Sequence, residues 1–160
     1  MRGTAVVFII VGFISVLCKI SWEDYQTGKI SDRQNGILLL LGLAAIWSFP
    51  EKLSAVYLPR PSVAGMFVVS LPLFLLGVIL PGSLGGGDVK LMAAGGFFLG
   101  VRGILLAAVL GFFCAGLYGA GLLLCHRAGR KSTFPLGPFL CLGMLGAFVI
   151  LCAGGSYLIL

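Results

Sequence analysis

The chain has 160 residues, of which 59% are apolar and 10% are charged, against about 25% charged residues in an ordinary soluble domain. This composition excludes a soluble globular enzyme, a disordered chain and a nucleic-acid-binding domain, and it indicates one membrane-embedded domain over residues 1–160. The net charge of +6 comes from basic residues in short connections, which is typical of topology signals. We therefore expect the lipid bilayer, and no nucleic acid, as a partner.

Six apolar runs predict an all-α bundle of about six transmembrane helices. They cover residues 4–17, 36–49, 63–80, 91–100, 104–125 and 139–160. The first run is interpreted as a retained span and not as a signal peptide, because no small-residue cleavage site precedes Cys18. The fourth run is shorter than the roughly 20 residues of a straight span, so it must borrow its flanks, tilt, or cross only part of the bilayer.

Glycine and cysteine usage fits the same class. The 25 glycines are typical of membrane helices, which use small residues to pack closely. The five cysteines lie in or beside apolar runs without a Cys-x-x-Cys pair, and His126 is the single histidine. We interpret these cysteines as small apolar packing residues and expect neither a metal site nor a disulfide framework.

Lysine and arginine counts predict the orientation. With the N-terminus outside, the inner connections hold Lys19, Lys29, Arg33, Lys90, Arg127, Arg130 and Lys131. The outer connections then hold Arg2, Lys52, Arg60 and Arg102. The excess inside favours both termini outside, provided that the short fourth run is a true span.

Four of the five acidic residues form two clusters at the ends of apolar runs. Glu23, Asp24 and Asp32 follow the first run, and Asp88 follows the third. Two crossings therefore separate Asp24 from Asp88, which puts both at the same membrane face whichever orientation holds. An ionisable residue at a helix end is either a solvated charge or a functional group, and a functional carboxylate pair is topologically allowed here.

A carboxylate pair suits the hydrolysis of a peptide bond. Two neighbouring carboxyl groups share one proton, since both do not ionise easily. The ionised group takes a proton from the attacking water, and the protonated group donates to the scissile carbonyl oxygen. No metal or cofactor is needed. Gly85, Gly86 and Gly87 allow a substrate strand to approach the backbone beside Asp88, although a flexible turn with one solvated aspartate explains this segment alone equally well.

Three segments resemble the type IV prepilin peptidase family. Residues 85–96, Gly-Gly-Gly-Asp-Val-Lys-Leu-Met-Ala-Ala-Gly-Gly, are similar to its GxGD-x-K-L segment. Asp24, followed by Ile30 six residues later, resembles its first aspartate motif, and residues 134–140 resemble its Pro-x-Gly-Pro-Phe-Leu segment. The three motifs keep the family's order over nearly the whole chain, so the chain is identified as a member of these GxGD aspartic membrane peptidases.

The resemblance implies an endopeptidase with Asp24 and Asp88 as its catalytic dyad. The implied substrate is a prepilin or pilin-like precursor with a short basic leader, usually a glycine before the cut, and then an apolar helix. Cleavage would occur at the cytoplasmic face of the cell inner membrane. Because the cysteine-rich loop of the long bifunctional members is missing, we expect the short form, with cleavage and no methyl transfer.

The resemblance also assigns supporting positions around the dyad. It favours site-shaping roles for Gly85, Gly86, Gly87, Lys90, Gly137 and Pro138. From the residues alone, Lys90 is equally a headgroup anchor and Gly137–Pro138 a helix breaker. Asp32, which stands where the family often has Asn, adds a third carboxylate whose influence on the dyad stays open. Glu23 is interpreted as solvated.

Two other functions use the same residues. A small proton-coupled carrier would employ the carboxylates as relay sites, but it predicts acidic residues within the spans, whereas these lie at span ends. An inactive assembly scaffold would keep the fold without catalysis, and the presence of both aspartates argues against it. The sequence predicts neither the identity of the precursor nor the oligomeric state.

Overall fold

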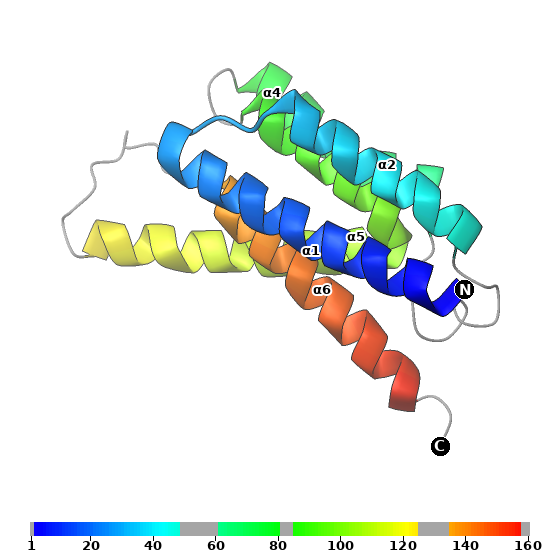
Figure 1. Ribbon diagram of the computed structural model, residues 1–160. Helices are drawn as coiled ribbons and strands as arrows, with labels where there is room; N and C mark the ends of the chain where they lie inside the picture. Colours follow the sequence, from blue (N-terminus) through cyan, green and yellow to red (C-terminus); the bar gives the residue numbers. More distant parts are fainter. Residues whose placement is uncertain (1, 49–60, 81–84, 125–134, 158–160) are drawn as a thin grey trace.

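The computed structural model describes residues 2–48, 61–80, 85–124 and 135–157, and within these ranges the chain forms five α-helices and no strand (Figure 1). The helices are α1 (Arg2–Thr27), α2 (Asp32–Ser48), α4 (Val63–Ile79), α5 (Gly86–Leu124) and α6 (Gly137–Tyr157). The predicted all-α class is therefore confirmed. Within the described residues each apolar run corresponds to a helix or a helix segment, and α1, α2, α5 and α6 extend beyond their runs into the polar flanks.

The expected number of about six membrane-spanning helices is not confirmed. Two helical stretches of the described chain, Thr4–Thr27 and Gly86–Leu122, are long and apolar enough to cross a bilayer by length and composition. Val63–Ile79 and Gly137–Ala153 are apolar but shorter. The 17 residues of α4 rise only about 26 Å, less than the roughly 30 Å of a hydrocarbon core.

The fourth and fifth apolar runs are joined in one bent helix. Gly100 interrupts α5 with φ 69° and ψ −180°, a conformation that favours glycine. The segment before Gly100 contacts α2, α4 and α6, and the segment after it contacts α6 (Figure 1). The sequence did not predict how the short fourth run is accommodated. In the structure this run continues directly into the fifth run at a bend.

The helices approach one another most closely at glycines. A Cβ atom on Gly65 of α4 would collide with the carbonyl oxygen of Gly96 of α5. A Cβ atom on Gly143 of α6 would lie 2.7 Å from the nitrogen of Gly111 of α5. Such crossings leave no room for a side chain, so the glycine content serves close helix packing as predicted.

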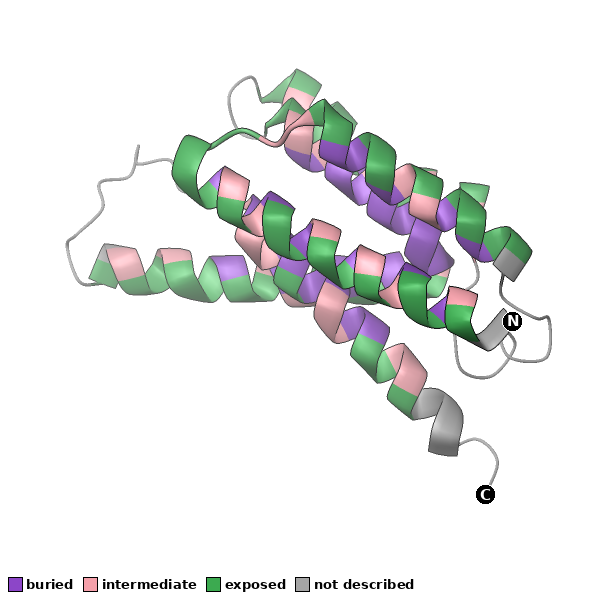
Figure 2. Ribbon diagram, in the orientation of Figure 1, coloured by how far each residue is buried: buried purple, intermediate pink, exposed green. Residues whose placement is uncertain are grey.

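Apolar side chains cover both the core and the exterior. Phe13 and Phe98 stack in the core with ring centroids 4.1 Å apart, and Phe148 packs beside Phe13. Buried residues line the faces on which the helices meet, while the outward faces are exposed (Figure 2). Many of these exposed residues are large and apolar, which suits a surface that contacts lipid.

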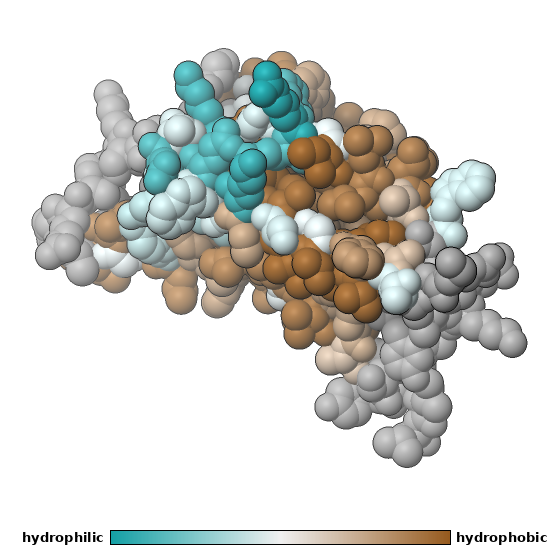
Figure 3. Space-filling model, viewed as in Figure 1, coloured by the Kyte–Doolittle hydropathy of each residue, from teal (hydrophilic) through white to brown (hydrophobic). Residues whose placement is uncertain are grey.

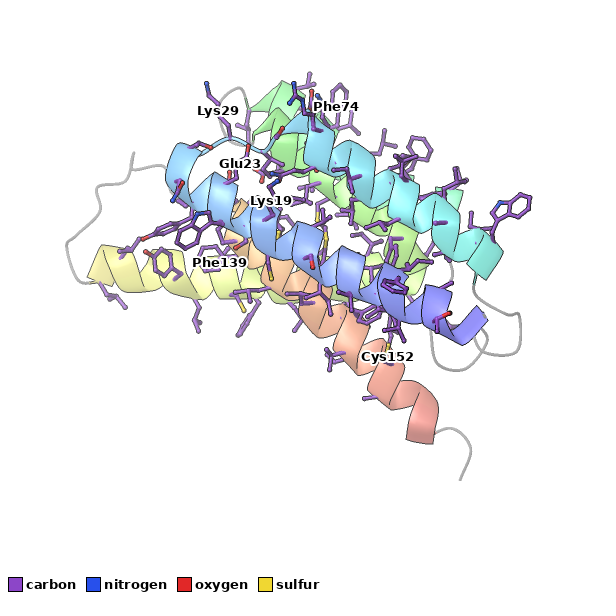
Figure 4. The ribbon with its side chains drawn as sticks, viewed as in Figure 1. Lys19, Glu23, Lys29, Phe74, Phe139 and Cys152 are labelled. Atoms are coloured by element: carbon purple, nitrogen blue, oxygen red, sulfur yellow. The ribbon has the colours of Figure 1, made fainter. Side chains whose placement is uncertain are left out.

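Hydrophilic residues gather at one end of the molecule (Figure 3). At this end α1 finishes, and α2, α5 and α6 begin (Figure 1). We call it the polar end. Lys19, Glu23 and Lys29 lie there, whereas Cys152 lies far along α6 toward the opposite end (Figure 4). The polar end is also where both aspartates of interest are found.

Candidate active site

Asp24, which follows the first apolar run in the sequence, belongs to helix α1. α1 continues past its apolar run to Thr27, and Gly28, at φ 63°, ends it by donating its N–H to the carbonyl oxygen of Asp24 at 2.8 Å. The helical extension turns Asp24 inward, and only 5% of the residue is exposed. A charged group buried to this extent requires partners.

The partner of the Asp24 carboxylate comes from the other end of the chain. The N–H of Gly137, the first residue of α6, donates to Asp24 Oδ2 at 2.9 Å in a buried setting. The first N–H groups of a helix have no partner within the helix, so Asp24 satisfies one of them from outside. A Cβ atom on residue 137 would lie 2.6 Å from the same oxygen, and this contact explains why glycine suits the position.

Asp88 obtains its partner locally. It lies in the first turn of α5, and its N–H donates to the carbonyl oxygen of Gly85 at 3.1 Å. Its carboxylate in turn accepts a hydrogen bond from the backbone of Gly85. The bond from the Gly85 backbone to the Asp88 carboxylate is one of the two hydrogen bonds of a capping box. It fixes the Asp88 side chain at the start of the helix. Asp88 is 9% exposed.

The structure places both aspartates at the polar end. Both side chains are buried there, and they belong to different helices. Each also lies at the N-terminus of a helix, Asp24 at that of α6 and Asp88 at that of α5. Where two buried carboxyl groups lie close together they do not both ionise easily, and such a pair holds one proton.

Some of the glycines and the proline predicted to shape the site pack closely against neighbouring residues, and others do not. Gly87 packs against Ile30 of the α1–α2 connection, where an added Cβ would lie 3.0 Å from the Ile30 Cβ. Pro138 lies half-buried in the first turn of α6, next to Gly137. A Cβ on Gly86 would meet nothing within 4 Å. Close neighbours therefore restrict the side chain at positions 85, 87 and 137. No neighbour does so at position 86.

Lys90 and Asp32 pair with each other. Lys90 Nζ lies 2.8 Å from Asp32 Oδ1 and 2.9 Å from Oδ2, and both side chains are exposed. In this arrangement Lys90 links the first turn of α5 to the first turn of α2. The third carboxylate is thus engaged by a cation at the protein surface.

Glu23 differs from the expectation of a solvated side chain. It is half-buried and accepts a hydrogen bond from the side-chain amide of Gln34. Sequence reasoning did not single out Gln34 or its neighbour Asn35, and each is only 6% exposed. A signal was present, because both residues precede Leu38 at helical spacing on the face that faces the core.

Several residues discussed from the sequence lie outside the described ranges. These are Glu51, Lys52, Arg60, Cys125, His126, Arg127, Arg130, Lys131 and Phe134. In the described part, Cys141 is buried in α6 near both aspartates, and it is a free thiol. Within the same part, no three His, Cys, Asp or Glu side chains are grouped as a metal site would require.

Comparison with known proteins places the chain in a family. Residues 10–120, which include both aspartates, match the model of the type IV leader peptidase family. The chain is also 29% identical over 142 residues to the prepilin leader peptidase/N-methyltransferase of Bacillus subtilis (strain 168). That alignment covers 89% of this chain and 55% of the relative, so the chain spans about half the length of the curated relative it matches. No solved structure matches significantly. The family model covers more than half of the sequence, and the chain therefore belongs to the type IV leader peptidase family.

Proposed function

We propose that the chain is a membrane aspartic endopeptidase that removes the leader peptide of prepilin or pilin-like precursors. The observation that carries this proposal is the burial of the Asp24 and Asp88 carboxyl groups at one end of a member of the leader peptidase family. The name of the Bacillus subtilis relative supports the class of substrate. We take residues 1–160 as one membrane-embedded peptidase domain.

The dyad would act by general acid–base catalysis. The ionised carboxylate accepts a proton from a water molecule while the water oxygen bonds to the scissile carbonyl carbon. The protonated carboxyl group donates its proton to the carbonyl oxygen. When the C–N bond breaks, the dyad donates its proton to the leaving nitrogen. It recovers one proton from a hydroxyl of the tetrahedral intermediate as the carbonyl re-forms, so the pair again holds one proton. The residues alone complete this cycle with water as the only co-reactant.

The polar end would face the cytoplasm, in a multi-pass protein of the inner membrane. Support comes from the basic residues, because Lys19 and Lys29 lie at the polar end and Lys90 lies near the start of α5 there (Figure 4). Arg2, by contrast, begins α1 at the opposite end. Positive residues concentrate on the cytoplasmic side of membrane proteins. A basic leader and its scissile bond would then meet the dyad at that surface.

A co-expression assay tests the proposal. A candidate precursor is expressed with the wild-type chain, with Asp24→Asn or with Asp88→Asn, and the precursor mass is followed by mass spectrometry. Asn keeps an oxygen that accepts the Gly137 or Gly85 hydrogen bond, so both variants should insert normally. We expect leader removal with wild type and a loss of about 10²–10⁴-fold in either variant.

A matched control separates chemistry from a general loss of negative charge. Asp32→Asn removes an exposed carboxylate that pairs with Lys90, and it should cleave nearly as well as wild type. Full activity in Asp24→Asn or Asp88→Asn would overturn the proposed dyad. The mass of the new N-terminus also reports methyl transfer, which we expect to be absent.

A further inference from the structure

The first turn of α2 is attached to the segments that carry both aspartates. Gln34 donates its side-chain amide to Glu23, the residue before Asp24. Asp32 pairs with Lys90, two residues after Asp88. Ile30, just before α2, packs against Gly87, the residue before Asp88. The start of α2 therefore contacts both of the segments that carry the proposed dyad.

Three contacts fix the register between α2 and α5. In order along the two segments, Ile30 packs against Gly87, Asp32 forms an ion pair with Lys90, and Gly42 packs against the ring of Phe97. The two helices thus run side by side in the same direction. Asn35 falls between the second and third contacts, on the face of α2 that carries the buried Leu38, and hence about one helical turn from Asp88.

The side-chain amides at this point have polar atoms without partners. Gln34 Oε1, Asn35 Nδ2 and Asn35 Oδ1 are buried, and none of them has a hydrogen bond in the described structure. Both residues are 94% buried by area, since 6% of each is exposed. Buried polar groups in native proteins are nearly always paired, and leaving them unpaired costs free energy. These amides are therefore suited to a partner that is absent from the free protein.

We propose that Asn35, assisted by Gln34, binds the peptide backbone of the substrate next to the scissile bond. This inference rests on the proposed function and assigns it a substrate-binding group. A primary amide offers one carbonyl acceptor and one N–H donor group, which complement the N–H and C=O of a single extended residue. A strand stretched across the dyad has such groups free. Recognition of this kind is independent of the substrate side chains.

The test uses Asn35→Leu, which keeps a similar volume and removes both polar functions. The probe is a synthetic peptide with a short basic leader, a glycine and an apolar segment. Its affinity is measured by direct binding in the Asp88→Asn background, and KM and kcat are measured with the intact dyad. We expect Kd and KM to rise about tenfold, as for the loss of one or two neutral hydrogen bonds, with kcat nearly unchanged.

Two further readouts separate binding from a structural role. The thermal unfolding midpoint of Asn35→Leu should equal or exceed that of wild type, because an unpaired buried amide is removed. Peptides carrying one backbone ester near the scissile bond should bind wild type more weakly, and this penalty should vanish in Asn35→Leu. Ser70→Ala, which removes a buried hydroxyl bonded within α4 to Met66, is the matched control and should alter neither readout.

The outcomes distinguish this inference from the proposed function. If wild type cleaves the peptide and Asn35→Leu leaves Kd and KM unchanged, the backbone-binding role is overturned and the peptidase stands. If Asn35→Leu unfolds at a lower temperature with a fall in kcat, the amide is structural and the inference also fails. If wild type binds the peptide through Asn35 without cleaving it, the binding role stands and the proposed function fails.

Discussion

The two aspartates reach the same place by different routes. Asp88 is held by its own turn, because Gly85 lies three residues earlier and bonds both its backbone and its side chain. Asp24 is held by Gly137, which is 113 positions away at the start of another helix. One carboxylate therefore depends on local sequence, and the other depends on the assembled bundle.

This difference shows which half of the site is sensitive to remote change. The first turn of a helix is stabilised by its own capping residues, so the position of the Asp88 side chain is set by neighbouring residues in the sequence. The Asp24 carboxylate is positioned only if α6 is packed correctly against α1 and α5. Perturbing α6 should therefore displace the Asp24 carboxylate more than the Asp88 carboxylate.

Gly137→Ala should have the largest effect among changes outside the dyad. The new Cβ would lie 2.6 Å from Asp24 Oδ2 and 2.8 Å from its carboxyl carbon, so the carboxylate must move. A displacement of about 1 Å in a catalytic group costs roughly 10²-fold in rate, and we expect a loss of that order. Initial cleavage rates of purified protein check this prediction.

Gly36→Ala is the matched control for Gly137→Ala. An added Cβ at position 36 of α2 would meet nothing within 4 Å. This variant should retain wild-type activity and gain slight stability, because Ala is favoured over Gly in helices by about 1 kcal/mol. Equal rates for Gly137→Ala and wild type would show that the Gly137 contact does not position Asp24.

Gly143→Ala should act on Asp24 from a distance. Its Cβ would collide with the carbonyl oxygen of Ala107 and would lie 2.7 Å from the nitrogen of Gly111, so α6 must shift relative to α5. We expect destabilisation of about 1–3 kcal/mol and a loss of activity smaller than that of Gly137→Ala. Thermal unfolding and cleavage rates check both effects, with Gly116→Ala as a control that meets no neighbour.

Gly85→Ala should be milder than Gly137→Ala. Its Cβ would lie 3.2 Å from Asp88 Oδ2, a contact that a shift of a few tenths of an ångström relieves. The backbone bonds that hold Asp88 remain, so we expect activity within about tenfold of wild type. A greater loss for Gly85→Ala than for Gly137→Ala would reverse the proposed asymmetry between the two aspartates.

Lys90→Met should have the smallest effect on activity. The Lys90–Asp32 pair is exposed on both sides, and exposed ion pairs contribute about 0–1 kcal/mol. We expect cleavage within about fivefold of wild type, which is the upper end of that range. Loss comparable to that of the dyad variants would mean that Lys90 contacts the substrate or the dyad directly.

Local sequence was sufficient to predict the helical class of the fold. Apolar runs predicted the helical class because a membrane helix must satisfy its own backbone. Topological parity predicted that Asp24 and Asp88 share one end, since it requires only a count of crossings. The capping of α5 was not predicted from the sequence, and the structure shows Asp88 in the first turn of that helix, bonded to Gly85 three residues earlier.

The remaining features depend on contacts between distant residues. The bend at Gly100 was not visible in a sequence where glycine occurs throughout, because most of the other glycines serve packing or have no close neighbour. The extension of α1 through Thr27 buries Asp24 against α6, whose start lies more than a hundred residues later. The burial of Gln34 and Asn35, and their unpaired amide atoms, depend on how α2 packs against α1 and α5.

The most direct test of the paired aspartates is the rate of leader removal in the two single Asp→Asn variants and in the double variant. Residues that act as one unit are strongly non-additive, so the double variant should be no slower than the worse single variant. Residual rates that multiply, with each substitution contributing its own factor, would show that Asp24 and Asp88 act independently and would contradict a shared dyad.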